Sequence, residues 1–539
     1  MSTVSENPYL SKASEHLNIT PSGKEYLKRI LTDTEGDVYV FTEQASPLMV
    51  AASMARLSRR GSDLREIYLD EFANTGPDKA SDLLKRVITA YGDDSVQQLL
   101  CLSVVVENAS NILTKKLEWG RLAAYLEQST RYIYFDQKDR FGRYRYYTPS
   151  NISLPLQVLY RETMDAIFEK YSLIVRGITQ YLREKIPEPT EKTERAAYIG
   201  AIRAQACDAA RPTLPAATTA TVGIVASAQA IESLILHLAS EPLLEARATA
   251  QLILREVRKV APVFFERADL PERGGAIIVH RMDIQRALEE QASFLLPRNR
   301  TSRSELVELI DYWPKDEFEI ISELLFPYAD GLSLPDIRRV VDGWGTEQKR
   351  EVFMAAIGER LNRRHKPGRA FEKIHYEWQI TGDYGSFRDL QRHRMVDAFE
   401  WQRLTPSHGY EVPRLVSDAG FETMFRNCFT MSEKLWTVLR NAGVEAEAQY
   451  ATLLGHRMRY RFLLNARAAF HFHELRSTPQ GHPGYRKIVQ EMHRLLCSVH
   501  PNIGAAMRFV NLGEDAELTR LASERTTQRK LELMERIAM

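Results

Sequence analysis

An internal repeat limits the folds open to this chain of 539 residues more than any other feature of its sequence. A stretch of the second half can be laid over a stretch of the first without a gap. Arg394 then falls on Arg121 and Glu400 on Glu127, with 273 positions between the members of each pair. A repeat of this length predicts two copies of one domain, because each copy is long enough to form its own core.

A second match extends the repeat toward the end of each copy. Residues 463–476 parallel residues 224–238 in the pattern of apolar and polar positions. We therefore predict two halves, 1–280 and 281–539, joined somewhere within 271–303. Each half is expected to be an α+β unit that is rich in helices and contains a mixed or antiparallel sheet.

Hydrophobic periodicity and proline punctuation predict the elements of each half. A short strand at 38–41 should precede a helix, and long helices should run over 155–185 and 194–268, the latter with two interruptions. Further helical stretches are expected over 95–117 in the first half and, in the second half, in a stretch that ends at residue 380. The interruptions are expected at 210–215 and 240–242.

The segment 120–132 carries side chains suited to binding an anion. If it is extended, Glu127, Ser129 and Arg131 alternate onto one face. Arginine can grip a phosphate with two hydrogen bonds, and a neighbouring serine can donate a third. The same spacing is also compatible with a solvated strand face that holds an internal ion pair, so both interpretations stay open.

Composition excludes several classes of protein. The 72 basic and 71 acidic residues leave a net charge of +1, which argues against a surface for duplex nucleic acid. No apolar run approaches the roughly 20 residues that a membrane helix needs. The N-terminal segment has no apolar core typical of a signal peptide, and the four cysteines are scattered, so a cytoplasmic protein without disulfides is expected.

The residues around 120–132 and their repeat resemble the signature of flavin-dependent thymidylate synthases. That family has an Arg-His-Arg triplet followed by Glu-x-Ser-x-Arg-Tyr. An Arg-x-x-Leu-Pro segment, an Asn-Ala-Arg segment and a late Leu-Arg pair follow in that order. The resemblance implies two tandem copies of that family's fold, each covering nearly all of its half.

Neither half carries the whole signature. The first half keeps Glu127, Ser129, Arg131, Tyr132 and Arg211. The second half keeps Arg392, His393, Arg394, Glu400, Asn465, Arg467 and Arg476. Leu404 and Gln449 replace the two first-half arginines, and Leu238 replaces the late one. In the family the active site lies between subunits, and the losses fall on opposite sides of it, so the resemblance implies one composite site per chain.

The resemblance also implies a role for each residue. The nucleotide is expected to be bound by Glu127, Gln128, Ser129, Thr130, Arg131, Arg211 and Arg392. FAD is expected to be bound by Glu127, Arg392, His393, Arg394, Asn465, Arg467 and His471. Arg476 is expected to be catalytic, because a cation beside the uracil ring would stabilise its anionic form and activate C5. Asn465 and Arg476, eleven residues apart, are expected to share one face of a helix.

The implied reaction is the FAD-dependent reductive methylation of dUMP to dTMP, with methylenetetrahydrofolate and NADPH as co-substrates. One alternative is another pyrimidine nucleotide, or a hydroxymethyl product. Another is a flavin- or nucleotide-binding regulator that does not turn over. A single-stranded nucleic-acid binder is a third, which the neutral net charge disfavours. A homodimer of fused chains is expected, since the family site needs several units.

A metal site is not expected. His456, His471, His473 and Glu474 form no HExxH pattern and have no cysteine nearby in sequence. Dinucleotide-binding and phosphate-loop glycine patterns are also missing from the sequence, so neither a Rossmann fold nor a P-loop fold is indicated.

Overall fold

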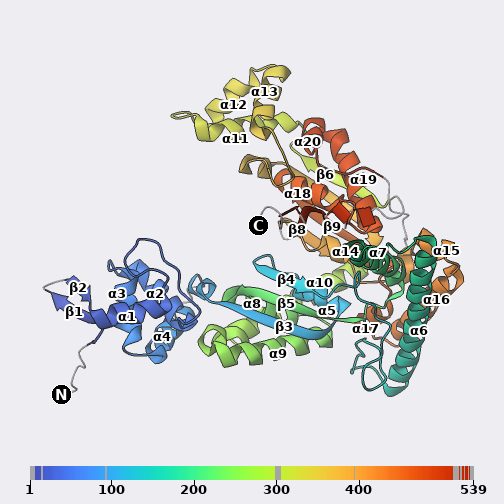
Figure 1. Cartoon of the computed structure of the whole chain (residues 1–539), viewed down its shortest axis with the longest axis horizontal. Helices are drawn as coiled ribbons and strands as arrows, with labels where there is room; N and C mark the ends of the chain where they lie inside the picture. The colour runs from blue at the N-terminus through green and yellow to red at the C-terminus, as the bar shows by residue number, and fades with distance from the viewer. Residues whose placement is uncertain are drawn as a thin grey trace. The chain divides into compact units, whose positions relative to one another are not determined.

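The computed structural model describes residues 7–13, 16–90, 94–297, 305–393 and 395–513, and four short pieces between 521 and 534. These residues form two compact units, coloured along the chain in Figure 1. Unit 1 consists of Met1–Val106, Trp119–Glu127 and Thr221–Arg298. Unit 2 consists of Glu107–Glu118, Gln128–Ala220 and Asn299–Met539. The predicted boundary at residue 280 lies inside helix α10 (Gly274–Leu295), and the extent of each half stays a prediction.

Unit 1 begins with a small lobe and continues into a sheet. The lobe contains β1 (Leu10–Ala13), β2 (His16–Ile19), α1 (Pro21–Ile30), α2 (Pro47–Arg56), α3 (Leu64–Tyr68) and α4 (Pro77–Leu84). The sheet has the order β3 (Cys101–Ser110), β5 (Thr219–Ser227), β4 (Ala123–Glu127), and β4 runs antiparallel to β5. Helices α8 (Ala228–Ala239) and α9 (Leu244–Val260) pack together after the sheet.

Unit 2 is built on a four-stranded antiparallel sheet. Its order is β6 (Val307–Trp313), β7 (His375–Asp383), β9 (Arg457–Asn465), β8 (Ala398–Trp401). Helix α19 (Pro483–Val499) packs on β6 and β7 and contacts α18 (Ala466–Arg476). The remaining helices are α5 (Asn111–Leu117), α6 (Leu154–Lys185), α7 (Lys192–Ala210), α11 (Ile321–Leu325), α12 (Leu334–Asp342), α13 (Thr346–Ile357), α14 (Tyr384–Leu390), α15 (Arg414–Asp418), α16 (Glu422–Asn441), α17 (Glu445–Ala448) and α20 (Pro501–Ala506).

The order of elements confirms two tandem copies of one α+β fold. The pair β7 and α14 repeats β3 and α5 after 273 positions, and β9 and α18 repeat β5 and α8 after 238. The sheet orders β3-β5-β4 and β7-β9-β8 therefore correspond strand for strand. Strand β6 adds an edge to the second sheet only, among the described residues.

Within unit 2, equivalent segments of the two halves bond to each other. Pro215 bridges Leu453, its own counterpart in the repeat. The amide of Ala216 donates to the carbonyl of Thr452 at 2.7 Å, and the amide of Leu454 donates to that of Leu214 at 2.8 Å. This reciprocal pair is what a local two-fold relation produces. The equivalent long helices α6 and α16 also pack side by side, as Figure 1 shows.

Three stretches that were expected to be helical are strands. The segments 101–110, 219–227 and 375–380 form β3, β5 and the start of β7. Each is rich in valine, threonine, isoleucine or aromatic residues, which favour extended backbone when a neighbouring strand is available for pairing. An apolar run of this length has too little periodicity to distinguish a helix from a strand.

Two further local predictions were wrong. The segment 38–41 is not a strand, although Phe41 makes an isolated bridge to Leu31. In the segment 120–132 the strand ends at Glu127, so Ser129 and Arg131 do not continue its face. The amide of Arg131 instead donates to Ser129 Oγ at 3.2 Å, and such a local bond competes with a strand ladder.

The first long helix is confirmed, and the second is confirmed only in part, because α7, α8 and α9 lie within 194–268 but β5 separates α7 from α8. Helix α6 ends at Lys185 as expected, and the second predicted helix is interrupted at η5 (Arg211–Thr213) and again before α9. Prolines at 212 and 215 account for the first break, because proline cannot continue the backbone ladder. None of the helices in the described ranges is long and apolar enough to cross a membrane.

Candidate functional site

Unit 2 contains a buried group of charged side chains drawn from both halves, here called the arginine cluster. Its members are Arg131, Asp208, Arg211, Asp389, Arg392 and Arg476. The charges of all four arginines act on the carboxylate of Asp389, so they surround one small volume. Beside the cluster lie His393, His482 and Tyr485, which all come from the second half.

Arg131 is held by the helix that precedes Arg211. Its Nε and Nη2 donate to the two carboxylate oxygens of Asp208 at 2.8 and 2.7 Å. Its Nη2 also reaches the carbonyl of Gln480 at 3.3 Å, and its Nη1 lies 3.5 Å from the hydroxyl of Tyr485. Although burial disfavours charge, Asp208 raises the pKa of Arg131, so the guanidinium stays protonated. A first-half arginine is thus fixed against second-half groups.

Arg211 stands where α7 gives way to η5 and is only 2% exposed. Its Nη1 donates to Asp389 Oδ2 at 3.3 Å. Its Nη2 is buried and has no hydrogen-bond partner among the described residues. Gly385 allows this approach, because a Cβ there would lie 3.3 Å from both Nε and Nη2 of Arg211. A buried guanidinium nitrogen without an acceptor fits an anionic ligand.

Asp389 lies in the last turn of α14 and Arg392 just after it, with 4.0 Å between Oδ1 and Nη2. Burial favours the neutral acid at Asp389, but the surrounding guanidinium groups outweigh it and place the pKa of that carboxyl below its ordinary value. The Arg392 side chain is 40% exposed, in contrast to the buried arginines. It therefore marks the edge of the cluster that faces solvent.

Arg476 ends α18 and is oriented by a histidine. Its Nε donates to Nε2 of His393 at 2.7 Å. Burial and the nearby positive charge of Arg476 hold the pKa of His393 well below its ordinary value, so its ring is neutral and can accept this bond. The Arg476 guanidinium carbon also lies 5.5 Å from the ring centre of Tyr485. The contact with His393 therefore uses the Nε–H of Arg476 and leaves its terminal nitrogens directed toward Tyr485 and the rest of the cluster.

Helix α19 closes the cluster with two residues near its start. His482 caps the helix by accepting from the amide of Gly484 at 3.1 Å, and burial together with Arg211 lowers the pKa of His482 to about 4. Tyr485 lies between Arg131 and Arg476, within 5.9 and 5.5 Å of their guanidinium carbons. The histidines are therefore neutral at physiological pH, and the four arginines exceed the two carboxylates by two positive charges.

The structure brings only part of the predicted site into the cluster. Arg131, Arg211, Arg392, His393 and Arg476 meet there, and Thr130 accepts from Arg388 Nη1 at 3.3 Å beside them. His471 lies next to His393, with 5.5 Å between ring centres. Gln128 accepts from Arg145, and Ser129 accepts from the amide of Arg131.

Other predicted residues have different positions. Asn465 is the N-cap of α18, where its Oδ1 accepts from the amide of Ala468 at 2.8 Å. It therefore precedes the helix that ends at Arg476, and the two do not share a helical face. Arg467 Nε donates to the carbonyl of Pro367 at 3.1 Å. Glu127 is buried and belongs to unit 1, and Arg394 lies outside the described residues.

Four residues of the site were missed from the sequence: Asp208, Asp389, His482 and Tyr485. A pattern was nevertheless available for the aspartates, since each precedes an arginine of the cluster by three positions, Arg211 and Arg392. The spacing suggests local pairs, but the structure exchanges partners, because Asp208 binds Arg131 and Asp389 binds Arg211.

The repeat positions equivalent to Arg131, Arg211 and Arg476 carry no charge. Leu404 stands where the first half has Arg131, and Gln449 begins η11 (Gln449–Ala451) where the first half has Arg211 in η5. The two replacements contact each other, since the amide of Leu404 donates to Gln449 Oε1 at 3.2 Å. Leu238, the counterpart of Arg476, is fully buried in unit 1. In the described part of the chain, no group of histidine, cysteine and acidic residues is arranged to hold a metal ion.

Comparison with known proteins places the repeat in a family. The family model described as thymidylate synthase complementing protein matches twice, over residues 40–263 and 308–502. A UPF0159 protein of Chlamydia pneumoniae is 31% identical over 522 residues, which cover 93% of this chain and 96% of that protein. A UPF0159 protein of Thermoplasma acidophilum is 28% identical over 499 residues, 88% of this chain and 97% of that one.

Among solved structures, similarity is found to a UMP/dUMP methylase from Streptomyces cacaoi that was crystallised with 5-Br dUMP. The match has a TM-score of 0.30 at 17% identity and covers 38% of this chain and 96% of that one. The repeat is assigned to the family by the two matches of the family model and does not depend on this structural similarity.

Proposed function

The chain belongs to the thymidylate synthase complementing protein family, and on that premise we propose that it methylates a pyrimidine nucleotide at the arginine cluster. The specific reaction we propose is the reductive methylation of dUMP to dTMP, with FAD as cofactor and methylenetetrahydrofolate and NADPH as co-substrates. One observation carries the proposal. Arginines from both halves converge in unit 2, while the repeat-equivalent positions Leu404, Gln449 and Leu238 carry no charge.

The nucleotide phosphate would be bound by Arg131 and Arg211. Both are buried, and Nη2 of Arg211 lacks an acceptor among the described residues. Asp208 and Asp389 hold the two guanidinium groups in place and offset half of the positive charge. The remaining excess favours a dianion such as a phosphate over a neutral ligand.

The uracil ring would lie against Arg476. Its Nε–H is used by the neutral ring of His393, so the guanidinium is held in one orientation with Nη1 and Nη2 directed elsewhere. A fixed cation at the carbonyl edge of the ring stabilises the anion that forms as C5 becomes nucleophilic. His393 acts here as a positioning residue, because it holds the arginine rather than the substrate.

The exposed edge of the cluster fits a flavin. Arg392 is 40% exposed there, and the aromatic rings of His393 and His471 lie together. Burial, with Lys366 and Arg363 nearby, lowers the pKa of His471 to about 4, so this ring is neutral as well. Arg392, His393 and His471 would hold the group, which when bound supplies the electron transfer that the reduction of the one-carbon unit requires.

Turnover by the full-length protein tests the proposal. Purified protein, supplied with FAD, dUMP, methylenetetrahydrofolate and NADPH, is expected to form dTMP, detected by chromatography and mass spectrometry. At a dUMP concentration below the dissociation constant, Arg131→Leu should strongly reduce the rate of product formation, whereas Leu404→Met, at the repeat-equivalent position, should not. Product from Arg131→Leu at the wild-type rate would remove the arginine cluster from the reaction.

Two alternatives give different results in the same experiment. Another pyrimidine nucleotide as substrate would give product from UMP or dCMP but not from dUMP, and a hydroxymethyl product would differ in mass from dTMP. A regulator without turnover would bind flavin and nucleotide and form no product from any of them.

A further inference from the structure

The last turn of α18 is held by a buried ion pair between Arg360 and Glu474, here called the anchor pair. Nη1 and Nη2 of Arg360 donate to the two carboxylate oxygens of Glu474, each at 2.6 Å, and the side chains are 1% and 0% exposed. Nη1 also donates to the carbonyl of Ala506 at 2.8 Å, and Nε donates to the carbonyl of His365 at 2.5 Å. One guanidinium group therefore joins α18 to the end of α20 and to the loop that follows α13.

Aromatic rings enclose the anchor pair. The guanidinium carbon of Arg360 lies 4.8 Å from the ring centre of Phe470 and 5.3 Å from that of Phe509. The amide of Phe509 also donates to Glu474 Oε1 at 3.5 Å. A charge-assisted bond with two parallel contacts fixes the relative orientation of both groups. Glu474 is therefore held in one position.

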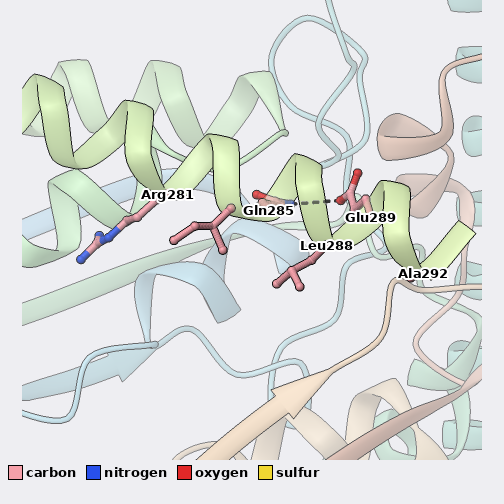
Figure 2. Close-up of a pocket in the computed structure, with 6 residues that line it drawn as sticks. Arg281, Gln285, Leu288, Glu289 and Ala292 are labelled. Atoms are coloured by element: carbon pink, nitrogen blue, oxygen red, sulfur yellow. Dashed lines mark hydrogen bonds between the residues drawn. The ribbon is translucent and has the colours of Figure 1, made fainter. Parts of the chain in front are cut away.

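A polar contact on α10 of unit 1 shows the opposite situation. Gln285 donates to Glu289 Oε1 at 3.2 Å, and both side chains line an open hollow on this helix (Figure 2). Glu289 is exposed, so water can replace the bond, and losing it costs little. Glu474 has no such replacement, and without Arg360 it would remain as a buried carboxylate with no counter-charge.

The first half shows that the fold does not need the anchor pair. Helix α8 is the equivalent of α18, and it carries the buried Leu236 at the position of Glu474. It also carries Leu238 at the position of Arg476. A buried ion pair is often no more stabilising than well-packed apolar residues of similar volume. Since the acid and the arginine occur in the same half and are missing from the same half, the acid accompanies Arg476 and not the fold.

Glu474 and Arg476 lie on opposite sides of one helical turn. Residues two apart in an α-helix point about 200° apart, since each step turns the chain by about 100°. The anchor pair therefore fixes the side of α18 that is turned away from Arg476. A second link runs through the loop, because Arg360 also holds the carbonyl that precedes Lys366, whose charge acts on His393. The ring of His393 is the group that accepts from Nε of Arg476 at 2.7 Å.

We propose that the anchor pair positions Arg476 for catalysis, an inference that rests on the proposed function. Arg360 and Glu474 are positioning residues, because they hold the helix that carries the arginine and not the substrate. A displacement of about 1 Å at a reacting group can lower turnover about 100-fold. Nucleotide affinity should be kept without the anchor pair, since Arg131 and Arg211 bind the phosphate from the other half.

The double variant Arg360→Met/Glu474→Leu tests the proposal in the full-length protein. It replaces both charges by apolar side chains, one of them the residue of the first half, and leaves no buried charge unpaired. Its denaturation midpoint should equal or exceed that of the wild type. Its kcat should fall by about 10- to 100-fold, while the dissociation constant for dUMP should stay within about twofold. Arg360→Lys keeps a positive charge beside Glu474 and should retain more of kcat than the double variant.

The nitrogen NMR signal of His393 Nε2 reports the position of Arg476 without any turnover. In protein labelled at histidine, with the signal assigned by its loss in His393→Gln, it should shift in the double variant, because Nε2 no longer accepts from Arg476. Leu236→Met is the matched control, a change of similar volume at the equivalent position of α8. It should leave both kcat and the His393 signal as they are in the wild type.

The outcomes separate this inference from the proposed function. A wild type that forms no product from any pyrimidine nucleotide would remove the proposed function, and the His393 signal would still test the anchor pair. An unshifted signal in the double variant, or a kcat within about twofold of the wild type, would overturn the proposal. A double variant that fails to fold, or that loses as much dUMP affinity as kcat, would overturn it too, because the pair would then serve the structure as a whole.

Discussion

The two short helical turns η5 and η11 occupy equivalent places in the repeat, yet one begins with Arg211 and the other with Gln449. Their backbones are alike, and both are tied into the reciprocal bonds between residues 214–216 and 452–454. Arg211 is buried beside Asp389, whereas Gln449 accepts a bond from the amide of Leu404. The two halves therefore share the backbone conformation at this place, but only the first half has a charged residue there.

The difference between the halves is tested most directly by replacing each arginine of the cluster with the residue at the equivalent position of the other half. Arg476→Leu installs the counterpart Leu238. The loss of a cation that stabilises developing negative charge should lower kcat by about 10²- to 10³-fold. Steady-state kinetics check this, and Arg476→Lys should restore part of kcat. An unchanged kcat in Arg476→Leu would exclude a catalytic role.

The next effect concerns nucleotide affinity. Arg131→Leu and Arg211→Gln each install the residue of the second half, and each removes one charge-assisted contact. Dissociation constants for dUMP should rise by about 10- to 150-fold, which corresponds to about 1.5–3 kcal/mol. Titration calorimetry measures both the affinity and the stoichiometry, which should be one nucleotide per chain. Two equal nucleotide sites per chain would contradict the single composite site that is built from residues of both halves.

A smaller effect is expected on acid stability. His473 is fully buried with no partner for either ring nitrogen among the described residues, and burial holds its pKa well below the ordinary value. The unfolded chain therefore takes up a proton below about pH 6.5 while the folded one does not, so stability falls as pH falls, by up to about 1.4 kcal/mol per unit. The first half carries Ile235 at this position.

His473→Ile should therefore make the free energy of unfolding less dependent on pH between 7.5 and 5.5, measured by denaturant titration. The neighbouring His493 ring, 5.7 Å away, remains in both proteins and cancels in the difference. Ile235→Val, a matched change in the first half, should leave the pH dependence as it is. An identical slope in wild type and His473→Ile would contradict the prediction.

The smallest expected effect is the change in stability when the helix cap of one half is given the residue of the other. Asn465 caps α18 as Ser227 caps α8, with bonds to the amides of Ala468 and Ala230 at 2.8 and 3.3 Å. Asparagine and serine cap equally well, so Asn465→Ser should change stability by no more than about 0.5 kcal/mol, and Asn465→Ala by about 1 kcal/mol. Flavin absorbance should be unchanged in Asn465→Ser. Loss of flavin without loss of stability would restore the cofactor role predicted for Asn465.

The repeat, the long helices and the arginines of the cluster could be predicted because each leaves a local pattern. Helix α6 is long and amphipathic, and proline marks the break at η5. Strands β3 and β5 could not be predicted, since short apolar runs have too little periodicity to distinguish a strand from a helix. Asp208 and Asp389 act on arginines 77 and 178 residues away, and such contacts depend on tertiary structure that no local pattern reports.

The reciprocal backbone bonds at Pro215 and Leu453 have a consequence for dilution. Two separate chains joined through these segments would come apart at low concentration, and any site made from both would be lost with them. Here one polypeptide connects the segments, so each finds the other at an effective concentration that does not fall when the protein is diluted. Arg131 therefore meets Tyr485 in a single molecule as readily as in a concentrated solution.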